Sequence, residues 1–238
     1  MASQNIAIVN RGGVLTDAAC AAWVPALQTQ ISRDFAPFWN ADAQLHFVGL
    51  NQQPDPTHWR CLILDRSDEA GDLGYHIDDT GIPEARVFAA DDLADGALVS
   101  VTLSHELLEM LANPSTTRFL TIGEAVYIIE VADPVEADGD GYDINGVRVS
   151  NFATPWYFGQ ANPAGDRRFD FRGLLSAGIP NLRPGGYIMD QVGGVWRSTI
   201  ARHPDGRLGK RALRSGRSSY RAMSPDRARL IRAAIGER

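Results

Sequence analysis

The stretch SHELLEM, residues 104–110, ends an apolar run and lies just before Asn113-Pro114. Its leucines and glutamates favour a helix, and the proline cannot continue one, so the sequence predicts a helix over roughly residues 97–112. Apolar side chains occur all round this helix, which is typical of a helix buried in a core. The stretch therefore places a buried helix at the centre of the fold.

The same helix carries the pattern HExxE, which differs at one position from the HExxH motif of zinc peptidases. Residues four apart share one face of a helix, so His105 and Glu109 can both bind one metal ion. Glu106 then stands where such enzymes keep the base that activates a water molecule. The alternative is a polar face without function, but a buried histidine with two carboxylates needs partners. We therefore expect a metal site with a general base beside it.

A third ligand must come from elsewhere in the chain, and the best source is EVADPVE, residues 130–136. Peptidase zinc sites usually have three protein ligands and one open position. Either Glu130 or Asp133 completes the set, and the other then orients His105 from outside it. Strand alternation puts these two carboxylates on opposite faces unless the turn at Pro134 rotates Asp133 back, so the residues leave both alternatives open.

The expected ligand set, one histidine with two carboxylates, is harder and more anionic than two histidines with one carboxylate. Zn²⁺ is the metal that we expect first, and Mn²⁺ or Fe²⁺ are the alternatives. An anionic ligand set also makes the ion a weaker Lewis acid, so water at such an ion is less acidic than in the best zinc sites.

Two more side chains are candidates for the chemistry. His76, in the sequence Gly74-Tyr75-His76, is a candidate fourth ligand or a donor that stabilises a transition-state oxyanion. Tyr157 and Tyr75 are weaker candidates for the same donor role, and the plain alternative for both is core packing. The segment DGDGYD, residues 138–143, lacks the spacing and the closing glutamate of a calcium loop, so we expect a polar turn there.

Short runs rich in β-branched and aromatic residues predict strands at residues 6–9, 44–48, 61–64, 86–89 and 125–132. Thr16-Asp17 is a typical helix start, and Pro25 should kink the helix that follows or mark a restart of it. Asn145-Gly146 between two short apolar runs predicts a tight β-hairpin.

Other parts of the chain are expected to be irregular. Residues 71–83 and residues 160–196 are rich in turn-forming residues, and a last hairpin is expected over residues 198–209. Ser224-Pro225-Asp226 is a plausible cap for a final helix that extends to Ile235.

The order of these elements indicates an α+β fold, with a mixed β-sheet packed on the N-terminal helix and the HExxE helix and a C-terminal half rich in strands and loops. The glycine-rich phosphate loops GxGxxG and GxxxxGK[ST] do not occur, which argues against a nucleotide-binding fold. We divide the chain into a metal-binding core at residues 1–160, a loop-rich extension at 161–196 and a basic tail at 197–238.

The chain resembles a set of uncharacterised bacterial and phage-encoded zincin-like metallopeptidases. The resemblance spans roughly residues 5–160 and rests on Gly74-Tyr75-His76, on residues 104–110 with Pro114, on the ExxDP segment at 130–136, and on residues 149–152 leading to Pro155. It implies a zincin-like fold, in which a mixed sheet lies above the active-site helix and the substrate lies along an edge strand. It also implies that His105 and Glu109 are ligands and that Glu106 is the general base.

The formal net charge of −6 hides a strong asymmetry. Residues 197–238 hold 12 Lys/Arg and 3 Asp/Glu, whereas residues 1–196 hold 11 Lys/Arg and 26 Asp/Glu. An acidic body agrees with a cation site, and the basic tail suits nucleic acid, an acidic partner or the body itself. Without interleaved aromatic residues or a zinc finger, the tail does not single out nucleic acid.

Bulk properties favour a cytoplasmic protein without a membrane segment. Apolar runs are too short to span a bilayer, and the N-terminus lacks the features of a signal peptide. The two cysteines, Cys20 and Cys61, do not form a disulfide framework.

The sequence thus predicts a metal-dependent hydrolase, foremost a peptidase, that acts on a peptide or protein substrate through a metal-activated water with Glu106 as general base. The main alternative is a non-catalytic, metal-stabilised module, such as a structural protein of a phage or a secretion system. A nucleic-acid-associated protein that uses residues 197–238 is the third reading.

Overall fold

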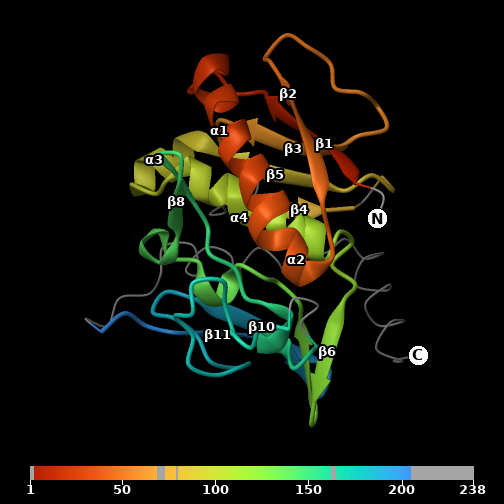
Figure 1. The fold of residues 1–238 in the computed structure, drawn as a ribbon, viewed down its shortest axis with the longest axis vertical. Helices are drawn as coiled ribbons and strands as arrows, with labels where there is room; N and C mark the ends of the chain where they lie inside the picture. Colours follow the sequence, from red (N-terminus) through yellow and green to blue (C-terminus); the bar gives the residue numbers. More distant parts are fainter. Residues whose placement is uncertain (1–2, 69–72, 79, 162–164, 205–238) are drawn as a thin grey trace.

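The computed structural model describes residues 3–68, 73–78, 80–161 and 165–204, and Figure 1 shows an α+β protein with a helix-covered sheet and a second, smaller sheet. The helices are α1 (Asp17–Thr29), the π-helix η1 (Gln30–Phe35), α2 (Ala36–Trp39), α3 (Ala89–Asp95), α4 (Val99–Ala112) and the 3₁₀ turns η2 (Asp133–Val135), η3 (Asp138–Asp140) and η4 (Pro155–Phe158). The expected α+β class is confirmed.

The main sheet has five strands in the order β2-β1-β3-β5-β4. Its strands are β1 (Gln4–Asn10), β2 (Ala43–Val48), β3 (Trp59–Leu64), β4 (Gly74–Ile77) and β5 (Glu84–Phe88). All neighbouring pairs are parallel except β4 and β5, which are antiparallel. Within the turn-rich region expected over residues 71–83, β4 pairs along β5 and forms an edge of the sheet. This edge strand lies against α4.

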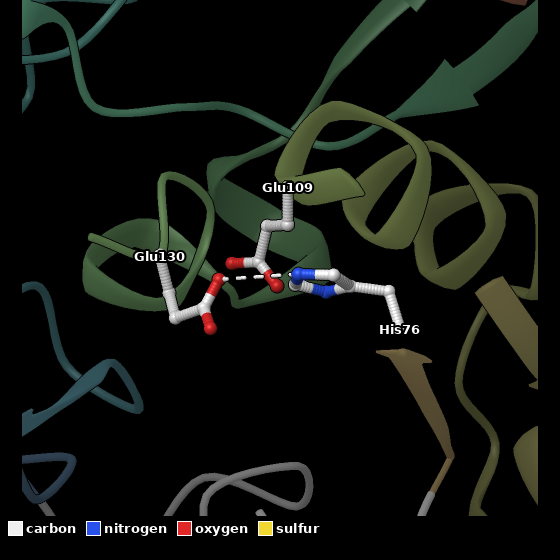
Figure 2. Close-up of side chains that lie close together, drawn as sticks. All are labelled: His76, Glu109 and Glu130. Atoms are coloured by element: carbon white, nitrogen blue, oxygen red, sulfur yellow. Dashed lines mark ion pairs between the residues drawn. The ribbon is translucent and has the colours of Figure 1, made fainter. Parts of the chain in front are cut away.

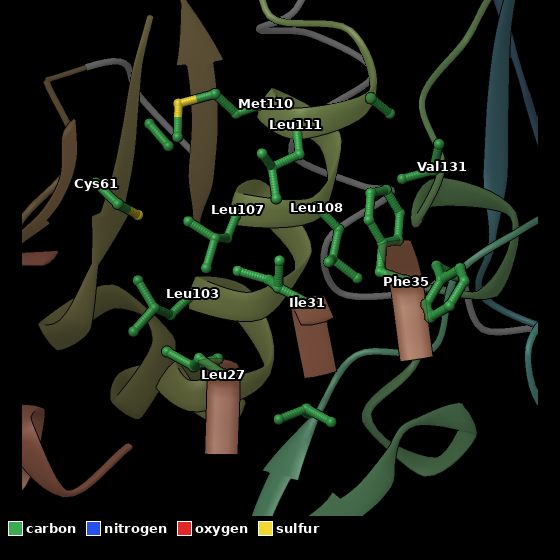
Figure 3. Close-up of a cluster of buried hydrophobic side chains, with 14 of the residues drawn as sticks. Leu27, Ile31, Phe35, Cys61, Leu103, Leu107, Leu108, Met110, Leu111 and Val131 are labelled. Carbon is green, nitrogen blue, oxygen red and sulfur yellow. The ribbon is translucent and has the colours of Figure 1, made fainter. Parts of the chain in front are cut away.

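Helices α1 and α4 pack on the same face of the sheet. Ile6, Ile8 and Ile63 point from the strands into the core cluster that includes Leu27 and Leu107 of the two helices. Figure 3 shows the interlocked side chains of Leu27, Ile31 and Phe35 with Leu103, Leu107, Leu108 and Leu111. The opposite face carries a smaller cluster of Ala7, Val9 and Val48, with Leu62 beside it. Burying both helices on one face brings α4 directly beneath the strands.

The N-terminal helix begins as expected, with the Thr16 hydroxyl accepting a hydrogen bond from the Ala19 amide at 3.2 Å. Pro25 does not end it: α1 continues to Thr29 and runs on without a break as η1 and α2. The π-helical turns of η1 begin five residues after Pro25. Buried side chains of η1, among them Ile31 and Phe35, keep their contacts with the core through these wider turns.

Helix α4 is buried along its whole length, as the apolar residues around it indicate. Its first turn is fixed by the carboxylate of Asp138, which accepts a hydrogen bond from the Leu98 amide at 3.0 Å. Asn113 caps the other end of the helix. The Asn113 side chain forms hydrogen bonds with main-chain atoms of Arg118 and Ile129. These contacts tie the helix to the chain that follows it.

A second sheet has the order β11-β10-β7-β6, formed by β6 (Phe119–Ile122), β7 (Ala125–Ile128), β10 (Tyr187–Val192) and β11 (Val195–Ile200). The strands differ from the expectations at two places. The strand expected over 125–132 ends at Ile128, and the region 160–196 contains β10 and the start of β11. The structure forms a hairpin at 187–200, and the one expected at 198–209 lies partly outside the described residues, which end at Pro204.

The short hairpin of β8 (Tyr142–Ile144) and β9 (Val147–Val149) is confirmed, with Asn145 and Gly146 at φ values of 50° and 82° in its turn. The expected final helix ending at Ile235 lies outside the described residues. Within the part of the chain that the structure describes, no helix is long and apolar enough to cross a membrane.

Candidate metal centre

His105, Glu109 and Asp133 converge beneath the main sheet. His105 Nε2 lies 3.3 Å from Glu109 Oε2, one helical turn along α4, and 3.2 Å from Asp133 Oδ1 at the start of η2. Two atoms that bind one zinc ion tetrahedrally at 2.0–2.1 Å are about 3.3–3.4 Å apart. The three side chains are buried, and their ligand atoms all lie within 4.8 Å of one another. Their spacing fits a single ion.

The electrostatics of this group would also suit a bound divalent cation. Burial alone would lower the pKa of His105, but the carboxylates of Glu109 and Asp133 raise it well above its ordinary value. Burial and the charge of Glu109 raise the pKa of Asp133, although His105 acts against them. The atom Asp133 Oδ1 is buried without a hydrogen-bond partner among the described residues. A divalent cation would satisfy that oxygen and offset both carboxylates.

Main-chain contacts hold Asp133 in place. The Arg183 amide donates to the Pro134 carbonyl at 3.0 Å, and the Ala153 amide donates to the Val131 carbonyl at 2.6 Å. Gly186 packs so closely that a Cβ atom there would lie 2.4 Å from the Pro134 carbonyl oxygen. The start of β10 thus supports the turn that carries the carboxylate.

Glu130 lies apart from His105. It belongs to a neighbouring group with His76 and Glu109, and its Oε2 atom lies 3.9 Å from His76 Nε2. Figure 2 shows these three side chains pointing toward one another. Since β7 ends before residue 129, strand alternation does not relate Glu130 to Asp133. Asp133 is the carboxylate that lies beside His105. Glu130 does not orient His105, because the Nδ1 atom of His105 is buried without a hydrogen-bond partner among the described residues.

A small pocket opens beside the group, lined by Gly74 of β4, by Thr102, His105 and Glu106 of α4, and by Glu136 and Tyr187. Glu106 reaches the edge strand, because a Cβ atom on Gly74 would be 2.8 Å from its Cγ and Oε1 atoms. Only glycine lets β4 come this close to the carboxylate. The pocket therefore has the predicted base in its wall, next to the predicted ligand His105.

His76 comes from the edge strand and faces two carboxylates. Its Nδ1 atom lies 3.8 Å from Glu106 Oε2, and its Nε2 atom lies 3.1 Å from the carbonyl oxygen of Asn113 and 3.9 Å from Glu130. The side chain is therefore beside the metal group and not in an isolated turn.

Tyr157 and Tyr75 are occupied elsewhere. Tyr157 is fully buried in η4, and its hydroxyl donates to the Asn181 carbonyl at 2.9 Å. Burial raises its pKa, so it stays protonated. Tyr75 bonds to Asp68 and accepts a hydrogen bond from Arg86 near the surface. Neither hydroxyl is directed into the pocket by these contacts.

Tyr187 and Asn113 are site residues that the sequence reasoning missed. Tyr187 lines the pocket, and its hydroxyl bonds to the Asp133 carboxylate and lowers the pKa of that group. It lies in a region expected to be loop, and only the preceding Gly185-Gly186 pair could have indicated a close approach. Asn113 had been interpreted only as the end of the helix.

Arginine side chains form hydrogen bonds and an ion pair with the polar turn at residues 138–141. Arg172 donates to the carbonyls of Gly139, Asp140 and Gly141, and Arg183 forms an ion pair with the Asp140 carboxylate. Guanidinium groups therefore take the oxygens that a calcium ion would need, which agrees with the expectation of a structural turn.

Comparisons with protein-family models, with curated proteins and with solved structures find no match. The candidate site is therefore argued from its own geometry.

Proposed function

We propose that the protein is a metal-dependent peptidase whose ion is held by His105, Glu109 and Asp133. The observation that carries the proposal is the convergence of these three buried side chains beside a pocket that Glu106 also lines. A divalent ion bound there would polarise a substrate carbonyl and make water more acidic. The carboxylate of Glu106 would take the proton of the attacking water and deliver it to the leaving amine.

The arrangement of the elements supports the zincin-like interpretation. A mixed sheet lies over α4, and its antiparallel edge strand β4 borders the pocket at Gly74. An edge strand has unpaired main-chain groups that can bind an extended peptide. Tyr187 would position Asp133 through its hydroxyl, and Gly74 would set the position of Glu106.

The test combines metal content with cleavage. Elemental mass spectrometry on purified wild type, His105→Ala and Glu106→Gln measures bound zinc, manganese and iron, and a peptide library read by mass spectrometry measures hydrolysis. We expect less metal in His105→Ala, wild-type metal in Glu106→Gln, and cleavage that falls about 10²–10⁴-fold in Glu106→Gln. Glu124→Gln, an exposed change in the turn between β6 and β7, is the control.

Two outcomes would contradict the proposal. Full activity in Glu106→Gln on a confirmed substrate would exclude Glu106 as the base. Metal that raises the melting temperature, with no cleavage of any library peptide, would support the non-catalytic, metal-stabilised module instead. Cleavage that a chelator abolishes would rule that module out.

A further inference from the structure

A second group of potential ligands lies next to the first and shares one residue with it. It consists of His76 from β4, Glu109 from α4 and Glu130 from the segment after β7, with one ligand atom of each within 4.8 Å of the others (Figure 2). His76 and Glu109 are buried, and the Glu130 side chain is 18% exposed. Three separate elements therefore bring one imidazole and two carboxylates to one point.

We propose that this group is a second divalent-cation site and that the carboxylate of Glu109 bridges it to the ion held by His105 and Asp133. Two-metal sites in enzymes hold their ions about 3.5–4 Å apart, a distance that one carboxylate spans. The two oxygens of Glu109 suit that role. Oε2 faces His105 at 3.3 Å, and Oε1 accepts a hydrogen bond from the Ala132 amide at 3.1 Å, which keeps the carboxylate oriented.

His76 and Glu130 of the second group are too far apart for a direct hydrogen bond and slightly farther apart than two ligands of one ion. His76 Nε2 and Glu130 Oε2 are 3.9 Å apart, beyond the 2.7–3.2 Å range of a hydrogen bond. Two ligand atoms at about 2.1 Å from one ion are separated by about 3.0–3.4 Å at octahedral or tetrahedral angles. A shift of about half an ångström by Glu130 would close the site, and its partial exposure leaves room for that shift.

The surroundings of His76 suit a metal ligand. Its Nε2 atom donates a hydrogen bond to the Asn113 carbonyl oxygen at 3.1 Å. To bind an ion through Nε2, the imidazole would carry its proton on Nδ1 instead, and the carbonyl oxygen, a hard donor, could then join the ligand set. On the other side of the ring, Nδ1 faces Glu106 Oε2 at 3.8 Å. Metal-binding histidines commonly have a carboxylate or carbonyl at the nitrogen that does not bind the ion.

The charge of the combined cluster also favours a second cation. His105 lies 3.3 Å from the carboxylate of Glu109 and 3.2 Å from that of Asp133, and His76 lies 3.8 Å and 3.9 Å from those of Glu106 and Glu130. Four carboxylates thus surround two imidazoles. With neutral imidazoles, one divalent ion leaves the cluster with a surplus of two negative charges, and a second ion offsets it. The second site has more oxygen than nitrogen, so it suits Mn²⁺ as well as Zn²⁺.

The test counts bound ions on the full chain, and the second site shares only Glu109 with the function proposed above. Metal-free protein is prepared with a chelator, titrated with Zn²⁺, and freed of excess ion before elemental analysis. We expect two equivalents in wild type and in the exposed control Glu124→Gln, and one equivalent in each of His76→Asn, Glu130→Gln and His105→Asn. Circular dichroism checks folding. If His76→Asn does not fold, Glu130→Gln tests the same site with a partly exposed side chain.

A spectroscopic measurement complements the count. Mn²⁺-loaded wild type should give the electron paramagnetic resonance signal of a coupled pair, and Glu130→Gln should give that of an isolated ion. One equivalent in wild type, or two in Glu130→Gln, would overturn the second site. If wild type binds a single ion, and if that ion is lost in His105→Asn but kept in Glu130→Gln, the second site is overturned and the proposed function stays intact. Two ions without peptide cleavage would contradict the proposed function alone.

Discussion

His105 Nε2 lies 3.2 Å from Asp133 Oδ1, and this contact joins helix α4 to the turn at η2. Both side chains are buried, so each changes how tightly the other holds a proton. The contact therefore couples the stability of the fold to pH and, under the proposed function, to metal.

The metal-free protein should lose stability as the pH rises. Burial and the charge of Glu109 raise the pKa of Asp133 to about 7, and the carboxylates raise the pKa of His105 well above 6.5 although burial opposes them. Groups that bind protons more tightly when folded stabilise the fold below their unfolded pKa, and this stabilisation is lost as the pH rises through the folded pKa. We expect the melting temperature in chelator to fall from about pH 6 to about pH 8.

Added Zn²⁺ should reverse the fall of the melting temperature with pH. The residues that bind Zn²⁺ must be deprotonated, so the affinity of the site for Zn²⁺ grows with pH. Differential scanning fluorimetry at several pH values, with chelator and with Zn²⁺, makes both measurements. Asp133→Asn should give a flatter profile in chelator. A wild-type melting temperature that rises over the same range would contradict the assigned directions.

Tyr187→Phe should weaken metal binding without removing a ligand. The phenol hydroxyl bonds to Asp133 and lowers the pKa of that carboxyl, so its loss makes Asp133 harder to ionise. Loss of such a supporting contact typically costs about 10–100-fold in metal affinity. Competition with a zinc-binding dye measures the change, and Tyr127→Phe on the neighbouring strand β7 is the control. Equal affinities in the two variants would show that the Tyr187 hydroxyl does not support the ligand.

Gly74→Ala should displace the base and spare the metal. The new methyl group would lie 2.8 Å from Glu106 and 3.0 Å from the Arg86 carbonyl oxygen, so the strand or the carboxylate must move. A shift of about 1 Å in a catalytic group can cost about 10²-fold in rate. Kinetics and metal content are measured together. Gly139→Ala, whose methyl group meets no atom within 4 Å, is the control, and unchanged turnover in Gly74→Ala would exclude this positioning role.

Leu107→Ala should destabilise the fold strongly. Leu107 is fully buried between α1 and the sheet, and its truncation leaves a cavity in the core seen in Figure 3. The expected loss in unfolding free energy is about 2–5 kcal/mol. Leu93→Ala on α3, where the leucine is 53% exposed, should change it by less than about 0.5 kcal/mol. Urea denaturation gives both values, and similar losses would place Leu107 outside the main core.

The sequence by itself determined the elements that depend on local chemistry. The caps at Thr16 and Asn113, the Asn145-Gly146 turn and the apolar surface of α4 are set by neighbouring residues, and their positions agree with the expectations. His105 and Glu109 share a face for the same reason, because a helix brings residues four apart together wherever it lies.

Only the tertiary structure decided which distant side chains meet that face. Sequence spacing left Glu130 and Asp133 equivalent, and the early end of β7, together with the packing of Gly186 on Pro134, brings Asp133 to His105. Strand β4 forms because β5 offers it hydrogen bonds, although its own sequence favours turns. His76 and Tyr187 reach the site through pairing between distant segments. Such contacts depend on loop closure and packing, which short-range patterns do not encode.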